Sequence, residues 1–323
     1  MGIRWDVSCF FSNNGFLKNL KEYPGFLPEW NFRGKNRILE SINLLKTRRE
    51  LSRGDFDIFH STYSKPYCRE WLRGKPYVIT VHDMTHEKYG AKLPSGIRET
   101  AEEKESIARA DAIICPSQAT ADDLVEWYPQ AAGKIRMIYH GVRIPDEIPA
   151  PPLEGKYILY VGSRMFYKNF PTAVRAVALL PQEYRLLCVG GGSFSDAEMR
   201  LFQACGMTGR VRHLQLDEPG LFAAYKGAAA LIFPSEAEGF GLPVIEAQSQ
   251  GCTPVLSDIP CFREIGGNAA FYFQPGDVEG CAGQLKNALQ NPVPAAVMQQ
   301  NLRRFDWKNA AFQTLELYRS LVK

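Results

Sequence analysis

The sequence lacks any run close to the roughly 20 consecutive apolar residues that a membrane-spanning helix needs, although 45% of its 323 residues are hydrophobic. It also lacks a strong charge imbalance, since the formal net charge is +3, and the composition therefore indicates no nucleic-acid partner. The start does not resemble a secretory signal, because Arg4 and Asp6 interrupt it. We expect a cytoplasmic globular protein, and the length favours two domains.

Cysteine is present but forms no familiar pattern. The eight cysteines are scattered singly, without a Cys-x-x-Cys pair or a histidine at metal-ligand spacing. We therefore predict buried free thiols rather than disulfides or a zinc site, which fits a reducing compartment.

Short apolar stretches alternate with helical patterns through most of the chain. The apolar stretches are residues 56–60, 77–82, 112–115, 135–139, 157–161, 185–189, 228–233 and 253–257. This alternation favours parallel sheets in doubly wound α/β domains. Ser117 is the predicted N-cap of one helix, and a second helix is predicted from Leu242. Gly190-Gly191-Gly192 by itself predicts only a tight turn. Residues 143–156 carry four prolines and no apolar periodicity, which is typical of a linker. The predicted division is a first domain at 1–145, a linker at 146–156, a second domain at 157–304, and a helical region at 305–323 that we expect to pack back on the first domain.

The N-terminal segment is the hardest part to interpret. Residues 7–11 could form a strand that is followed by a turn at 12–15. Residues 18–53 hold nine lysines and arginines against four glutamates, with aromatic residues between them. A solvated basic face is the simplest interpretation. The alternative is a peripheral surface that meets an anionic membrane or a lipid-diphosphate acceptor.

The clearest chemistry lies between Pro234 and Ala247, where a buried strand leads into a helix. Seven residues separate Glu238 from Glu246, and two glycines lie close by. A glycine-rich helix entry offers unpaired N–H groups and a positive dipole end to a phosphate, whereas carboxylates suit sugar hydroxyls. After an earlier strand, Arg164 and Lys168 supply cations that suit a diphosphate. Together these residues predict a nucleotide-diphosphate-sugar pocket.

At this point the residues resemble those of glycosyltransferase family 4, a group of retaining enzymes with the two-domain GT-B fold. The stretch from Glu238 to Glu246 is similar to the Glu-x7-Glu motif of that family. The other similar stretches are Thr80-Val81-His82-Asp83, Pro116-Ser117 to Leu124, Ile138 to Val142, Tyr160 to Asn169, Ser257 to Pro260 and Glu264 to Gly267. The resemblance covers most of the chain and implies an α/β protein of two Rossmann-like, doubly wound domains that face each other across a cleft.

The resemblance also implies a role for each site residue of the second domain. Arg164 and Lys168 would hold the donor diphosphate and stabilise the leaving group. Glu246 would bind the ribose hydroxyls, and Glu238 would contact the donor sugar. The backbone that lines the sugar and phosphate site would be that of Gly239, Phe240, Gly241 and Leu242.

Across the cleft, His82 would lie against the donor sugar, and Asp83 would lie near the acceptor. The catalytic residues would be His82, Glu238, Arg164 and Lys168. The resemblance implies no metal and no cofactor apart from the donor. Simpler interpretations remain open for four residues. His82 could be a structural histidine at a strand end, Asp83 could cap the following turn, Glu238 could be structural, and Glu246 could face solvent.

The predicted function is that of a retaining, metal-independent hexosyltransferase in polysaccharide or glycoconjugate synthesis. Its donor would be a UDP- or GDP-linked sugar, and its acceptor a saccharide or a lipid-linked saccharide. The chain departs from the family pattern at its start, where we find no strand followed by a Gly-Gly loop. The alternative is therefore a sugar-nucleotide-binding module of the same fold with little or no turnover. An epimerase of this fold is less favoured because the Glu-x7-Glu context argues against it. A phosphorylase is less favoured because the sequence has no pyridoxal-binding lysine context.

Overall fold

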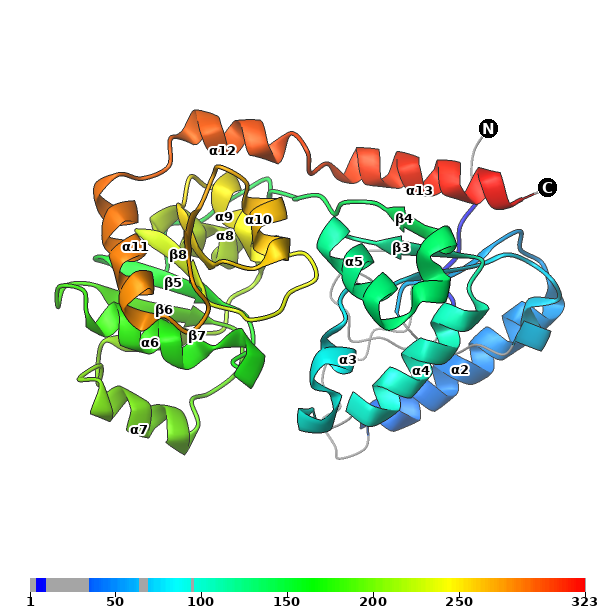
Figure 1. The fold of residues 1–323 in the computed structure, drawn as a ribbon, viewed down its shortest axis with the longest axis horizontal. Helices are drawn as coiled ribbons and strands as arrows, with labels where there is room; N and C mark the ends of the chain where they lie inside the picture. The colour runs from blue at the N-terminus through cyan, green and yellow to red at the C-terminus, as the bar shows by residue number, and fades with distance from the viewer. Residues whose placement is uncertain (1–3, 10–34, 64–68, 94–95, 323) are drawn as a thin grey trace.

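The computed structural model describes residues 4–9, 35–63, 69–93 and 96–322. These residues form two α/β lobes, each built around a parallel sheet (Figure 1). The predicted fold class is therefore confirmed. Residues 138–156, which join the two lobes, contain no helix or strand, and the exact domain boundaries stay a prediction.

The first lobe contains a four-stranded sheet with the order β1-β2-β3-β4, and each neighbouring pair is parallel. Its elements are α2 (Lys35–Arg53), β1 (Phe59–Ser61), η1 (Arg69–Leu72), β2 (Tyr77–Thr80), α3 (Thr85–Tyr89), η2 (Gly90–Lys92), α4 (Gly96–Arg109), β3 (Ala112–Cys115), α5 (Gln118–Trp127), η3 (Pro129–Lys134) and β4 (Ile135–Met137).

The second lobe contains a six-stranded parallel sheet with the order β10-β9-β8-β5-β6-β7. Its elements are β5 (Tyr157–Val161), η4 (Phe166–Lys168), α6 (Phe170–Ala178), β6 (Arg185–Val189), α7 (Asp196–Ala204), β7 (Val211–Leu214), α8 (Glu218–Gly227), β8 (Ala230–Phe233), α9 (Leu242–Ser249), β9 (Pro254–Ser257), α10 (Pro260–Gly266), β10 (Phe271–Phe273), α11 (Val278–Gln290) and α12 (Ala295–Leu302). The chain continues into α13 (Trp307–Leu321).

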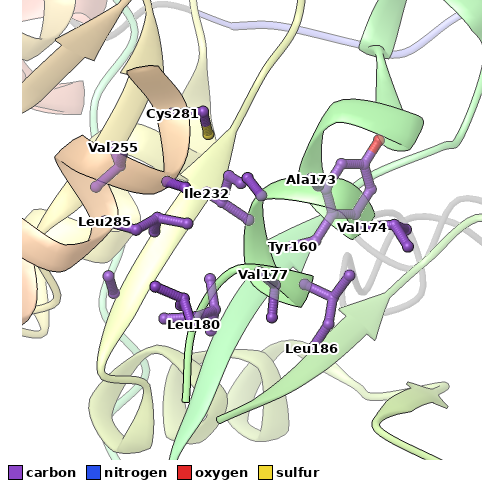
Figure 2. Packing of buried hydrophobic residues seen from close by; sticks show 14 of the residues in the cluster. Tyr160, Ala173, Val174, Val177, Leu180, Leu186, Ile232, Val255, Cys281 and Leu285 are labelled. Carbon is purple, nitrogen blue, oxygen red and sulfur yellow. The ribbon is translucent and has the colours of Figure 1, made fainter. Parts of the chain in front are cut away.

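Both faces of the second sheet are covered at its centre, where every residue of β5 and β8 is buried rather than every second one. Along β5, Ile158 and Tyr160 belong to the core on one face, whereas Leu159 and Val161 belong to the core on the other. The first core includes residues of α6 and α11. Figure 2 shows it with Tyr160, Ala173, Val174, Val177, Leu180, Leu186, Ile232, Val255, Cys281 and Leu285 labelled.

The C-terminal helix α13 leaves the second lobe and covers one face of the first sheet (Figure 1). Its buried residues Ala310 and Leu317 share a core with Val78 and Ile114. A polar contact reinforces this packing, since the Tyr318 hydroxyl lies 2.5 Å from a ring nitrogen of His60. The last helix therefore joins the C-terminal end of the chain to the first lobe.

The expected strand at residues 7–11 is wrong in its described part, because residues 7–9 have no regular structure. Their polar groups bind α2 rather than a neighbouring strand: the Ser8 hydroxyl donates to Thr47 Oγ1 and Lys46 Nζ donates to the Cys9 carbonyl. The expected turn at 12–15 and the basic residues at 18–34 lie outside the described residues.

Among the described residues, Cys115, Cys188, Cys205, Cys252, Cys261 and Cys281 are free thiols, and all of these except Cys205 are buried. Burial raises the pKa of the Cys115 and Cys188 thiols to about 12, which keeps both in the unreactive thiol form at neutral pH. In the described part of the chain, no helix is long and apolar enough to cross a membrane.

Candidate active site

The loop between β8 and α9 brings the predicted donor residues to the carboxyl edge of the second sheet. Gly241 adopts a φ of 90° directly before α9, in the left-handed region that favours glycine. The Phe240 side chain is buried, with its ring 5.1 Å from that of His140 and 5.7 Å from that of Phe305. Leu242 opens α9 and is partly exposed. The ring of Phe240 thus anchors the loop, and the predicted contact of the loop backbone with a ligand stays a prediction.

Lys168 and Glu238 meet as a half-buried ion pair in the second lobe. Lys168 Nζ donates to Glu238 Oε1 at 2.6 Å, and the two side chains are only 17% and 11% exposed. Burial raises the pKa of Glu238, and the charge of Lys168 opposes that shift. Each residue is at present the partner of the other, so a ligand that binds both must compete with this pair.

Glu246 lies in the second turn of α9 and does not simply face solvent. Its Oε2 accepts a hydrogen bond from the Tyr225 hydroxyl at 2.8 Å. Burial raises the pKa of Glu246, while the hydrogen bond from Tyr225 opposes the shift. One hydrogen bond leaves this carboxylate with free acceptor capacity, which suits a pair of hydroxyls.

Arg164 has a nearly buried guanidinium that is engaged within its own lobe. Its Nε donates to Glu198 Oε1 at 2.5 Å, and its two terminal nitrogens donate to the carbonyls of the loop from Gly190 to Ser193. The three glycines of that loop all have positive φ, which turns their carbonyls toward one cation. In this arrangement Arg164 orders the Gly190–Ser193 loop, and its predicted contact with a diphosphate stays a prediction.

His82 and Asp83 follow β2 at the carboxyl edge of the first sheet. His82 Nε2 lies 2.9 Å from the Thr62 carbonyl, and because a carbonyl only accepts, this nitrogen carries the proton. Asp83 Oδ1 accepts from the Thr85 backbone N–H at 2.8 Å, so the side chain caps the turn into α3 as the simpler interpretation held. Both residues also line a hollow that includes His86, the other lining residues being Tyr63, Glu99, Glu102 and Glu103.

The two halves of the predicted site touch at Gly239. A Cβ on this residue would overlap the His82 carbonyl oxygen and would lie 2.7 Å from Asp83 Cβ. Only glycine therefore permits the approach. A second contact between the lobes lies nearby, where the Tyr89 ring stacks on Tyr167 at 5.7 Å and 14°. The structure thus places the predicted donor loop against the residues predicted on the acceptor side.

Sequence reasoning did not identify the partners of these residues. Tyr225 and Glu198 are ordinary helix residues by pattern, and nothing in their spacing connects them to Glu246 or Arg164. Ser117 was recognised as a helix cap, which it is, but its contact with the other lobe was not foreseen.

Among the described residues, no group of three or more His, Cys, Asp or Glu side chains is arranged to hold a metal ion. The sequence does contain one Asp-x-Asp tripeptide, Asp55-Phe56-Asp57. It precedes β1 at the amino edge of the first sheet, whereas His82 lies beyond the opposite edge.

Two family profiles divide the chain between them. The profile described as Glycosyltransferase Family 4 matches residues 4–144, and that described as Glycosyl transferases group 1 matches residues 145–305. The chain belongs to glycosyltransferase family 4. It is therefore a glycosyltransferase by family, as the motifs around Glu238 and Glu246 predicted.

Family-4 relatives match over most of the chain at modest identity. D-inositol 3-phosphate glycosyltransferase of Xylanimonas cellulosilytica is 27% identical over 88% of this chain and 76% of its own length. The O-antigen chain mannosyltransferase RfbU of Salmonella typhimurium is 29% identical over 72% of this chain and 66% of its own. Phosphatidyl-myo-inositol mannosyltransferase of Mycobacterium leprae is 28% identical over 86% and 77%.

Solved structures confirm the two-lobed GT-B fold. Sucrose-phosphate synthase from Thermosynechococcus elongatus superposes with a TM-score of 0.73 at 22% identity, covering 90% of this chain and 80% of that one. Anabaena Alr3699/HepE in complex with UDP-glucose gives a TM-score of 0.72 at 18% identity, covering 96% and 90%.

Proposed function

We propose that this family-4 glycosyltransferase moves a hexose from a UDP- or GDP-linked sugar to a saccharide or lipid-linked saccharide acceptor, with retention of the anomeric configuration and without a metal. The observation that carries the proposal is the Lys168–Glu238 pair, which lies beside the loop that touches His82. It sets a cation for a diphosphate and a carboxylate for a sugar at the junction of the two lobes.

The ion pair suggests how the donor binds. The diphosphate takes Lys168 Nζ from Glu238, and the released carboxylate then accepts from a hydroxyl of the sugar. Glu246, which is bound only through one oxygen to Tyr225, accepts from the ribose hydroxyls. After this exchange Lys168 is paired with the diphosphate and Glu238 is hydrogen-bonded to a hydroxyl, so neither buried ion is left without a partner.

The leaving group is stabilised by charge. When the sugar–phosphate bond breaks, negative charge grows on the nucleoside diphosphate, where Lys168 and the positive end of α9 lie. The sequence offers no obvious nucleophile for a covalent intermediate. We therefore propose that the acceptor attacks from the face that the diphosphate leaves, which accounts for retention.

The hollow beside His82 suits an acceptor rich in hydroxyl groups. Its lining includes Asp83 and three glutamates of α4, and carboxylates accept hydrogen bonds from sugar hydroxyls. The names of the relatives agree with a saccharide or inositol-containing acceptor, and a solved relative in complex with UDP-glucose agrees with a nucleotide-sugar donor.

The test is a panel of UDP- and GDP-linked sugars, with donor binding measured by calorimetry and release of nucleoside diphosphate measured with and without candidate acceptors. We expect binding and acceptor-stimulated release for at least one donor. The Lys168→Ala variant should lose about 1.5–3 kcal/mol of donor binding or transition-state stabilisation, because one charge-assisted contact is removed.

Lys286→Ala is the matched control, since Lys286 is exposed on α11, and it should behave like the unmodified protein. Binding without release, even with acceptors, would exclude turnover and leave the sugar-nucleotide-binding module. No binding to any donor would exclude both functions.

We also propose that α2 brings the enzyme to an anionic membrane that carries a lipid-linked acceptor. This helix holds six lysines and arginines against two glutamates. Arg48, Arg49 and Arg53 are exposed, and Leu44 and Leu45 are 45% and 65% exposed beside them. Exposed cations next to exposed leucines are typical of a surface that meets anionic headgroups.

A further inference from the structure

The start of α5 and the helix α10 meet across the junction of the lobes, although 145 residues of chain separate Ala119 from Glu264. The function proposed above uses neither. Ser117, the N-cap of α5, follows β3 at the carboxyl edge of the first sheet. It therefore stands on the same side of the sheet as His82 and faces the second lobe.

Two buried hydroxyls of the first lobe hold one carbonyl of the second. Ser117 Oγ donates to the Gly239 carbonyl at 2.6 Å, and Thr120 Oγ1 donates to the same oxygen at 2.9 Å. The exposed fractions of Ser117 and Thr120 are 0% and 1%. A carbonyl oxygen accepts two hydrogen bonds, so both of its positions are used.

Glu264 makes the second half of this contact. Its Oε1 accepts from the Gln118 backbone N–H at 2.7 Å and its Oε2 accepts from that of Ala119 at 2.9 Å. These N–H groups have no partner within their own helix, and they lie at its positive end. A carboxylate from one lobe therefore caps a helix of the other. Arg304 stabilises the backbone at Glu264 by donating a hydrogen bond to the Glu264 carbonyl at 3.0 Å.

These contacts fix the position of the loop that carries Glu238. The same Gly239 whose carbonyl is held by α5 lies against the His82 backbone. A shift of the lobes that breaks the hydrogen bonds to Ser117 and Thr120 also moves Glu238 away from His82. The predicted donor ligands Lys168, Glu238 and Glu246, in contrast, all belong to the second lobe and keep their mutual arrangement when the lobes part.

We propose that Thr120 and Glu264 are positioning residues of the transferase. Their hydrogen bonds between the lobes, called the clasp below, hold the donor loop against the first lobe and align a bound donor with His82 and the acceptor hollow. The proposal rests on the proposed function. Donor affinity depends on the second lobe alone, whereas turnover needs the two lobes in the relative position that the clasp maintains. Loss of the clasp therefore lowers kcat much more than it raises the KM for the donor.

The test compares Glu264→Ala, which removes both acceptors at the start of α5, with Thr120→Val, which removes one hydroxyl and keeps the shape of the side chain. Thr120→Ser restores the hydroxyl. Glu279→Ala is the matched control, because Glu279 is an exposed glutamate at the start of α11. For each protein, kcat and the donor KM are measured, and small-angle X-ray scattering gives the radius of gyration.

We expect Glu264→Ala and Thr120→Val to lower kcat about tenfold or more, since small misplacements of reacting groups reduce rates steeply. The donor KM should stay within about twofold, and the radius of gyration of Glu264→Ala should increase. Thr120→Ser and Glu279→Ala should match the unmodified protein. Unchanged kcat in both variants, or a rise in donor KM equal to the fall in kcat/KM, would overturn the proposal.

The scattering measurement separates this proposal from the proposed function. If the unmodified protein releases no nucleoside diphosphate from any donor, the proposed function fails, and the clasp is then decided by the radius of gyration alone. An increase in Glu264→Ala, with none in Glu279→Ala, supports a clasp between the lobes. Equal values in the two variants contradict it.

Discussion

Arg164 illustrates what a motif can and cannot indicate about one side chain. Its place after β5 predicted a cation for a diphosphate, and the structure shows a guanidinium that binds Glu198 and the carbonyls of the Gly190–Ser193 loop. Arginine suits this place because its planar fork presents five N–H donors in a fixed geometry, whereas lysine has three on a single nitrogen. The triple glycine, which alone predicted only a tight turn, is explained by the same contacts.

Glu198 gives the first prediction at the residue scale. Burial alone would raise its pKa, but the Ser195 backbone N–H and hydroxyl and the guanidinium of Arg164 together lower it below 4.5. Glu198→Gln should lower the free energy of unfolding by about 1–3 kcal/mol at neutral pH, because a charge-assisted hydrogen bond to a nearly buried arginine is lost.

The pH dependence follows from the sign of that shift. A carboxyl whose pKa is lower in the folded state contributes stability above its unfolded pKa and loses it as the pH falls through the folded pKa. The difference between the unmodified protein and Glu198→Gln should therefore shrink on acidification below 4.5. Chemical denaturation from neutral to acidic pH measures it, with Glu183→Gln as an exposed control. A difference that stays constant over this range would contradict the account.

At the scale of elements, the starts of α5 and α9 bring residues to the junction of the lobes and to the candidate site. The sequence predicted the start of α5, and Ser117 caps it as expected, accepting from the Thr120 N–H. It predicted α9 from Leu242, which the structure confirms. It did not predict α10, whose Glu264 completes the contact between the lobes, because a helix of seven residues has too little periodicity to detect.

Helix α2 gives the prediction at this scale. The double variant Arg48→Glu with Arg49→Glu should weaken sedimentation with phosphatidylglycerol vesicles at least about tenfold, since each basic residue near an anionic surface contributes about 1 kcal/mol. Binding to neutral phosphatidylcholine vesicles should stay weak for every variant.

The control reverses two exposed lysines of the other lobe, Lys226→Glu with Lys286→Glu, and so makes the same change in net charge. Equal binding losses in the two double variants would mean that net charge, rather than α2, decides the interaction. Equal binding to both vesicle types by the unmodified protein would remove the membrane proposal.

At the scale of the whole molecule, helix α13 at the end of the chain completes one core of the first lobe. Four of the residues in its core with the first sheet come from β2, β3 and the segment after β4, and two come from α13. The His60 ring, which contacts Tyr318, has its pKa lowered to about 4 by burial and by His82. This histidine is therefore neutral at physiological pH and suits a buried hydrogen bond.

Leu317→Ala should lower the free energy of unfolding by about 2–3 kcal/mol, because a leucine that is 6% exposed leaves a cavity against the sheet. Phe312→Ala on the same helix is the control, since Phe312 is 59% exposed and should change stability by less than about 0.5 kcal/mol. Denaturant unfolding of both variants gives the comparison. Similar losses in the two would contradict the packing of α13 on the first sheet.

The sequence by itself determined most of the strands, the family and the list of candidate site residues. Apolar runs such as 157–161 and capped helix starts such as that of α5 are local signals, fixed by residues close together in the chain. The Glu-x7-Glu stretch is local as well, which is why it could be recognised without coordinates.

Only the tertiary structure decided which partner each of these residues has. Lys168 pairs with Glu238, and Arg164 binds Glu198. Between the lobes, Ser117 and Thr120 bind the Gly239 carbonyl, and Glu264 binds the start of α5. All of these contacts join residues far apart in the chain. Hydrogen bonds and ion pairs are made at distances of about 3 Å. Which groups come that close depends on how two sheets and their helices pack, and no local pattern records it.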